Sequence, residues 1–166
     1  MIHPSQYNWL TRFIGKVVDI IRPQYIKTVE YTVGVGGSTE VDYTFDNTQN
    51  NMTIQGIQLG GTAIIPANSI PTAIIIKCTE DLSTGAATGQ VSMGTASGGA
   101  QFRALITCDD AGEYSRGVVA ATFSDSLMAT DYSVYFNVTP NTNWDDASMT
   151  TGKWKIWITY VDNSIL

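Results

Sequence analysis

The stretch GKWKIWITYVD, residues 152–162, decides the fold that this sequence predicts. Its alternate positions form two sets: an apolar set of Trp154, Ile156, Ile158 and Tyr160, and a second set of Lys153, Lys155, Trp157 and Thr159. Successive side chains of a strand point to opposite faces, so the first set predicts a core stripe and the lysines predict a solvated face. We therefore predict a half-buried central strand rather than an aromatic ligand platform. Trp157 lies on the lysine side, and we expect it to face a neighbouring subunit.

Further stretches carry strand patterns and are joined by short turns rich in Gly, Asn, Asp and Ser. They are residues 24–35, 35–46, 52–61, 72–82, 88–99, 101–110, 117–126 and 130–140. The apolar run within 72–82 predicts a strand buried on both faces, and a change of parity at Gly56 predicts a bulge or bend. Together they predict a mainly β protein, an antiparallel, jelly-roll-like β-sandwich of about nine strands. The strand order, jelly-roll or immunoglobulin-like, stays open because pairing order does not follow from strand count.

The first 23 residues carry a different pattern. Leu10, Ile14, Val17 and Ile21 follow one another at steps of four, three and four residues, which is the spacing of an amphipathic helix. Trp9 and Phe13 widen this stripe, and a strand over residues 16–21 is the alternative. We expect an N-terminal amphipathic arm over residues 1–23, for docking or oligomerisation, and a β-sandwich domain over residues 24–166. The candidate assembly interface is Trp9, Leu10, Phe13, Ile14, Val17, Ile21 and Trp157.

The composition excludes several kinds of partner. Charged residues make up only 14% of the chain and hydrophobic residues 43%, which leaves a neutral, hydrogen-bonding surface. The net charge of -6 opposes binding of nucleic acid, because phosphate recognition requires clustered Lys and Arg. No stretch approaches the roughly twenty apolar residues of a membrane span, and the N-terminus does not predict a signal peptide. We expect no nucleic-acid partner and no membrane.

Residues for catalysis are sparse. The one histidine, His3, lies near the N-terminus, and no G-x-S-x-G motif occurs. Cys78 and Cys108 lack metal-binding spacing and are interpreted as small buried hydrophobes in preference to a disulfide. Acid pairs such as Asp109-Asp110 fall in predicted loops without the spacing of a calcium loop. The sequence therefore predicts no enzyme, no cofactor and no metal.

One loop has the composition of a ligand site. In NTNWDDAS, residues 141–148, Trp144 stands beside Asp145 and Asp146. An exposed aromatic next to hydrogen-bonding acids suits sugar stacking, so we consider this the candidate ligand loop for a host-surface glycan. We prefer the other interpretation of this loop, in which Trp144 folds over the end of the sandwich.

Three segments resemble small β-sandwich virion proteins of tailed bacteriophages. They are IPTAIIIKCTEDLSTGAATGQVSMGTA (residues 70–96), FSDSLMATDYSVYFNVTP (123–140) and TTGKWKIWITYVDN (150–163). In such proteins a strand enters after an Ile-Pro turn and leads to a V-S-x-G strand, and a Trp- or Val-rich strand comes near the end. The resemblance is one of pattern, spans residues 70–166, and points to head decoration proteins, head fibres and tail tips.

The resemblance implies a non-enzymatic, structural role in the virion. It implies other virion proteins, of capsid or tail, as partners, and a homo-oligomer with a trimer favoured. Two alternatives stay open: a carbohydrate- or receptor-binding β-sandwich module, and a jelly-roll capsid protein that forms the shell. Shell proteins that enclose nucleic acid often carry a basic inner arm, whereas the first 23 residues have only Arg12, Lys16 and Arg22, opposed by Asp19.

Overall fold

The computed structural model describes residues 26–36, 38–45, 55–82, 89–118, 130–140 and 151–162. In this part of the chain there are nine strands and no helix, so the prediction of a mainly β protein is confirmed. The strands are β1 (Ile26–Val35), β2 (Tyr43–Phe45), β3 (Gln55–Gln58), β4 (Ile70–Glu80), β5 (Gly89–Gly94), β6 (Arg103–Thr107), β7 (Tyr114–Val118), β8 (Tyr135–Pro140) and β9 (Lys153–Val161). The helix expected within residues 1–23 lies outside the described residues. The described ranges hold no helix of the length and hydrophobicity that a membrane span requires.

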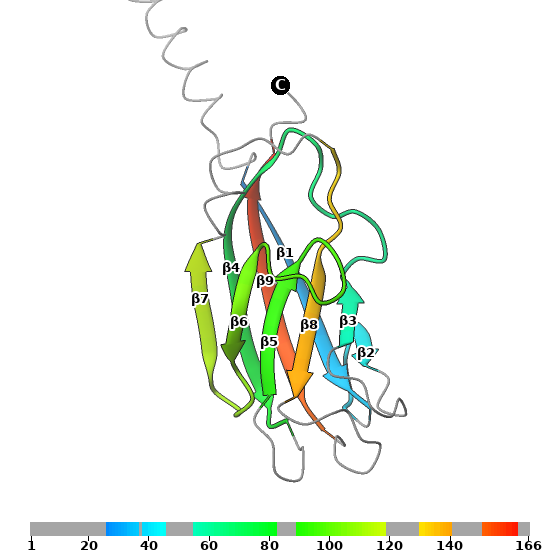
Figure 1. The fold of residues 1–166 in the computed structure, drawn as a ribbon, viewed down its shortest axis with the longest axis vertical. Coiled ribbons are helices and arrows are strands. Elements are labelled where there is room, and N and C mark those ends of the chain that lie inside the picture. Colours follow the sequence, from blue (N-terminus) through cyan, green and yellow to red (C-terminus); the bar gives the residue numbers. More distant parts are fainter. Residues whose placement is uncertain are drawn as a thin grey trace, which may run out of the picture.

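The strands form two sheets, one in the order β2-β1-β9-β4-β7 and the other in the order β3-β8-β5-β6 (Figure 1). If β2 is set aside, the other strands pair from the outside inward. The first pairs with the last (β1 with β9), then β3 with β8, β4 with β7, and β5 with β6. This is the strand order of a jelly roll. Of the two strand orders that the sequence left open, the structure therefore has the jelly-roll order and not the immunoglobulin-like one.

The strand β2 is an addition to this pattern, and it corrects the prediction of a wholly antiparallel fold. It runs parallel to β1, with Val33 opposite Tyr43 and Val35 opposite Phe45. The chain turns back beside β1 before β2 begins: Asp42 N–H donates to Thr32 O at 2.8 Å, and Asp42 Oδ2 accepts from Thr32 N–H at 2.6 Å. Because of this return, β2 runs in the same direction as β1. Every other pairing is antiparallel.

The last strand, β9, is central, as the alternation in residues 152–162 predicts. It pairs with β1 on one side and with β4 on the other. Trp154, Ile156 and Ile158 are buried, and Tyr160 is 6% exposed. The core face of the strand is thus the predicted one.

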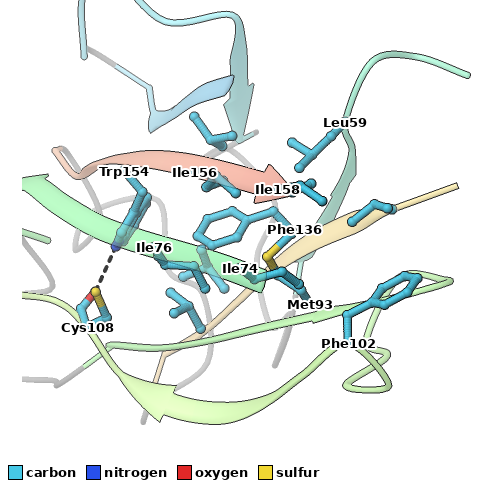
Figure 2. Close-up of a cluster of buried hydrophobic side chains, with 14 of the residues drawn as sticks. Leu59, Ile74, Ile76, Met93, Phe102, Cys108, Phe136, Trp154, Ile156 and Ile158 are labelled. Carbon is cyan, nitrogen blue, oxygen red and sulfur yellow. Dashed lines mark hydrogen bonds between the residues drawn. The ribbon is translucent and has the colours of Figure 1, made fainter. Parts of the chain in front are cut away.

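The core lies between the two sheets, and both sheets contribute large side chains to it (Figure 2). Trp154 of β9 lies 5.6 Å from Phe136 of β8 and 6.5 Å from Phe45 of β2, measured between ring centroids. The Trp154 Nε1–H donates to Cys108 O at 2.7 Å, so the one polar atom of this ring is satisfied. The contact between Trp154 and Phe136 joins the two layers at the centre of the core.

Two local predictions are wrong. The strand in 72–82 is not buried on both faces: Ile74, Ile76 and Cys78 are buried, while the alternate residues, Lys77 among them, face outward and are half-buried or exposed. No bulge occurs at Gly56, which pairs in register with Asn137. A Cβ at Gly56 would meet Asn137 Oδ1 at 2.3 Å, so glycine is required here for the Asn137 side chain to lie against the backbone of β3. The strand expected over 117–126 overlaps the end of β7 at residues 117–118, and its remainder stays a prediction because residues 119–129 lie outside the described ones.

Candidate functional site

The surface of the first sheet that faces away from the core contains Trp157, and we call it the outer face. The register of the strands aligns Glu30 of β1, Trp157 of β9, Ile75 of β4 and Arg116 of β7 in one row across four strands. Both Ile75 and Trp157 are half-buried, and the flanking Glu30 and Arg116 are exposed. In this row, two apolar side chains on β9 and β4 therefore lie between a charged side chain on β1 and another on β7.

Glu30 holds Trp157 in place. The Trp157 Nε1–H donates to Glu30 Oε2 at 2.7 Å, and Lys155 Nζ lies 3.2 Å from Glu30 Oε1. The indole hydrogen bond, and after it Lys155, lowers the pKa of the Glu30 carboxyl below its ordinary value. The neighbouring row is tied in the same way, because the Thr28 and Thr159 hydroxyls lie 3.0 Å apart. The indole of Trp157 is thus held to β1 by a hydrogen bond from the edge of its ring.

Replacing Trp157 with phenylalanine should make the thermal stability depend on pH in a defined way. The lowered pKa of Glu30 means that the carboxylate stabilises the fold above its ordinary pKa, and that this stabilisation is lost as the pH falls through the lowered value. We expect a small decrease in Tm for Trp157→Phe at neutral pH, and a gap to wild type that closes in acid. The measurement is thermal unfolding over a pH series. The same change in a Glu30→Gln background is the control, and a gap that is constant with pH in the wild-type background would contradict the assignment.

Basic side chains gather beside this row. Lys77 of β4 lies directly opposite Lys155 of β9 on one side and opposite Tyr114 of β7 on the other. Tyr114 is 65% exposed, and Lys77 and Arg116 are also exposed. Within the described ranges Lys77 and Arg116 form no ion pair, whereas Lys155 has Glu30. We call Lys77, Tyr114, Arg116 and Lys155 the basic face.

Carboxylates gather at one end of the sandwich, in the chain after β4 and in the link from β6 to β7, which Figure 1 shows at the lower end of the molecule. We call Asp81, Asp109, Asp110 and Glu113 the acidic end. Backbone amides donate to Asp109 Oδ2 at 2.8 Å and to Asp81 Oδ1 at 2.6 Å, and Glu113 Oε2 accepts from the amides of Asp109 and Asp110 at 3.0 and 3.2 Å. The negative charge of Asp109, followed by that of Glu113, raises the pKa of Asp110. These bonds fix the loops, but among the described residues none of the four carboxylates forms an ion pair with a basic side chain.

The two cysteines belong to the core. Cys78 and Cys108 are both buried and free, in agreement with the prediction of small buried hydrophobes. Burial raises the pKa of Cys78 to about 12 and that of Cys108 to about 11, so both are protonated thiols at neutral pH. Thiols in this state are poor nucleophiles.

Of the candidate residues, the structure describes Trp157 alone. The rest of the predicted assembly interface (Trp9, Leu10, Phe13, Ile14, Val17 and Ile21) and the candidate ligand loop (Trp144, Asp145 and Asp146) lie outside the described residues, as does His3. Within the described ranges no group of His, Cys, Asp or Glu is arranged to hold a metal ion. Sequence reasoning missed Glu30, which lies opposite Trp157, and also Lys77 and Arg116 on the same face of the sheet. Alternation gives the face of a side chain but not the register between strands.

Comparison with known proteins shows a shared fold. No protein-family model matches this sequence, and no curated protein matches it. The structure is similar to a chain of the cyanophage Pam1 capsid asymmetric unit, with 17% sequence identity and a TM-score of 0.51, over 82% of this chain and 84% of that one. It is also similar to a chain of the capsid of Ralstonia phage GP4, with 21% identity and a TM-score of 0.50, over 83% of this chain and 84% of that one. In both cases the likeness spans most of both chains.

Proposed function

We propose that this chain is a non-enzymatic structural component of a bacteriophage virion. The observation that carries the proposal is the likeness, over more than four-fifths of the chain, to chains from two phage capsids. Those two proteins come from capsids, which favours a position in the head, as a capsid decoration or head-fibre protein, over one in the tail. Jelly rolls occur in viral capsid proteins, and the strand order seen here suits that role.

The chemistry of the described residues supports a structural role. Both thiols lie in the core with raised pKa values. The carboxylates of the acidic end accept hydrogen bonds from loop amides, which is a structural use of these groups. The two described tryptophans also have structural uses: Trp154 packs in the core, and Trp157 is hydrogen-bonded to a neighbouring strand.

The proposed docking element is the N-terminal arm, residues 1–23. Its apolar stripe, which includes Leu10 and Val17, is more than a single sandwich requires, and an apolar stripe of this kind suits an interface with another virion protein or with further copies of the arm. We propose that the arm attaches the sandwich to the capsid, and that the protein forms a homo-oligomer, with a trimer favoured.

Replacing both Leu10 and Val17 with Asp should abolish incorporation into particles, because two charges would lie within the apolar stripe. The control is Asn8→Asp with Gly15→Asp, which adds the same charge at the same spacing of seven residues but on the opposite side of the predicted helix. Copies per purified particle, counted by quantitative mass spectrometry, should fall at least tenfold for the first variant relative to the control. Normal loading of the Leu10/Val17 variant would exclude docking through this stripe.

The second candidate is a jelly-roll protein that forms the shell itself. The same likeness to capsid chains favours it, because a capsid contains shell proteins as well as any protein attached to them. Expression of the full chain alone separates the two functions by electron microscopy. A shell protein assembles into closed or tubular shells without other components, whereas a decoration protein stays a small oligomer.

A further inference from the structure

The outer face and the acidic end share an electrostatic feature: each carries charged side chains that form no ion pair among the described residues. On the outer face, Lys77 stands directly opposite Lys155, and like charges at opposed positions of neighbouring strands destabilise a sheet. Lys155 forms an ion pair with Glu30, and Lys153 of the same strand forms one with Glu80. Lys77 and Arg116 therefore leave positive charge exposed on a chain whose net charge is -6.

The acidic end has the opposite excess. Its four carboxylates lie close enough together that the charge of Asp109 raises the pKa of Asp110. Hydrogen bonds from backbone amides reach Asp81, Asp109 and Glu113, whereas no described residue donates one to the carboxylate of Asp110, which is exposed. Asp110 is thus the member of the acidic end best placed to meet a cation.

We infer that the basic face of one copy binds the acidic end of a second copy of this chain. Charge complementarity favours a second copy of this chain as the partner. Each copy carries both a basic surface and an acidic one with unpaired charges, and contact between copies would reduce the repulsion within each surface. The inference deepens the proposed function, on which it rests for the expectation of a homo-oligomer.

The geometry of the two surfaces sets the symmetry of the contact. The basic face lies on the flat of a sheet, while the acidic end lies on loops at one end of the sandwich. Contact between two different surfaces is head-to-tail, and it closes into a ring when the rotation between copies permits. A trimer formed in this way would contain three equivalent contacts. The other sheet is less suited to this contact, because the link between β5 and β6 folds over its outward side at Ser92 and Asn137.

The exposed aromatic of the basic face adds to the contact. Tyr114, opposite Lys77, combines an apolar ring with a hydroxyl, and tyrosine is enriched in protein interfaces. The half-buried Ile75 and Trp157 lie in the next row. The basic face thus has apolar area beside its charges, so the contact does not depend on charge alone.

The test is sedimentation velocity on the isolated full chain and on charge-reversed variants. Wild type should associate at about 0.01 M salt and dissociate towards 1 M, where the Debye length falls from about 30 Å to about 3 Å. Lys77→Glu and Asp110→Lys should each weaken self-association at least tenfold. The double variant carries both changes, has the wild-type net charge, and should recover association to within about threefold of wild type.

The control is Thr62→Glu with Ala63→Glu, which gives the same net charge as Lys77→Glu but changes an exposed loop that belongs to neither surface. It should associate as wild type does. A wild type that stays monomeric at low salt, association that is insensitive to salt, or a double variant that fails to recover would each overturn the inference. Binding of a monomeric wild type to heparin would overturn it too, and would identify an anionic polysaccharide as the occupant. None of these measurements involves particles, so failure here is distinct from failure of the virion role.

Discussion

Replacing Trp154 with alanine should lower the free energy of unfolding by about 3 to 5 kcal/mol, which is the range for truncation of a large aromatic in a core. Trp154 is 0% exposed and lies between Phe45 of β2 and Phe136 of β8, so its removal opens a cavity between the two sheets. The truncation also leaves Cys108 O without the indole donor. Urea denaturation of the full chain, followed by circular dichroism, measures the effect.

Trp157 provides the matched control, because it is the same residue type on the same strand and faces the opposite way. Trp157→Ala should cost only about 1 kcal/mol, since the side chain is half-buried and its hydrogen-bond partner Glu30 is exposed to water. Trp154→Phe keeps an aromatic ring in the core but removes the indole donor and part of the packed volume, and should cost less than Trp154→Ala, about 1 to 3 kcal/mol. Equal losses for Trp154→Ala and Trp157→Ala would contradict the placement of the core.

The contrast between these tryptophans shows how far alternation predicts the fold. A period of two decides which side chains of β9 face the core, and Trp154, Ile156 and Ile158 are buried as predicted. The apolar run in β4 predicted burial on both faces, which is wrong because the period of two holds there as well: Ile75 faces outward between the buried Ile74 and Ile76. Three consecutive isoleucines show no alternation of polarity, so the sequence does not indicate which of them faces the core.

The candidate site was harder to predict, because it depends on pairs of residues far apart in the chain. Glu30 and Trp157 are separated by 127 positions, and Lys77 meets Lys155 through the register of β4 with β9. Pairing order follows from the whole fold and not from any local pattern, so neither the Glu30 tether nor the opposed lysines could be read from the sequence. The parallel strand β2 is a similar case, since the return of the chain at Asp42 depends on a contact with Thr32.

A buried polar network on the second sheet is the other place where a single change should have a large effect. Asn137 is 0% exposed in β8 and holds the link between β5 and β6 against the sheet. Its Oδ1 accepts from Gly98 N–H at 2.8 Å, and its Nδ2–H donates to Gly99 O at 2.7 Å. Ser92 Oγ also donates to Gly99 O, at 3.1 Å. Gly56 of β3 lies against the same side chain, since a Cβ at Gly56 would meet Asn137 Oδ1 at 2.3 Å.

Asn137→Leu, which is similar in size, should therefore cost about 1 to 3 kcal/mol, because two hydrogen bonds to the link, with Gly98 N–H and Gly99 O, are lost at about 0.5 to 1.5 kcal/mol each. The control is Gln90→Leu, on the same side of β5 but half-buried, which should change the free energy of unfolding by about 0.5 kcal/mol or less. Urea denaturation of both variants measures the difference. Similar losses in the two would mean that the asparagine does not secure the loop.

Asn137→Asp tests whether hydrogen bonding, and not size, is responsible. Burial raises the pKa of a carboxyl at such a position, so the protonated acid persists to a higher pH in the folded state than in the unfolded chain. A protonated acid can donate to Gly99 O in place of the amide, whereas a carboxylate would repel that carbonyl. Because the folded pKa is the higher one, the stability of this variant relative to wild type should rise as the pH falls through it, and should be lost again as the pH rises. A deficit that is the same in acid and at neutral pH would assign the effect to packing against Gly56 instead.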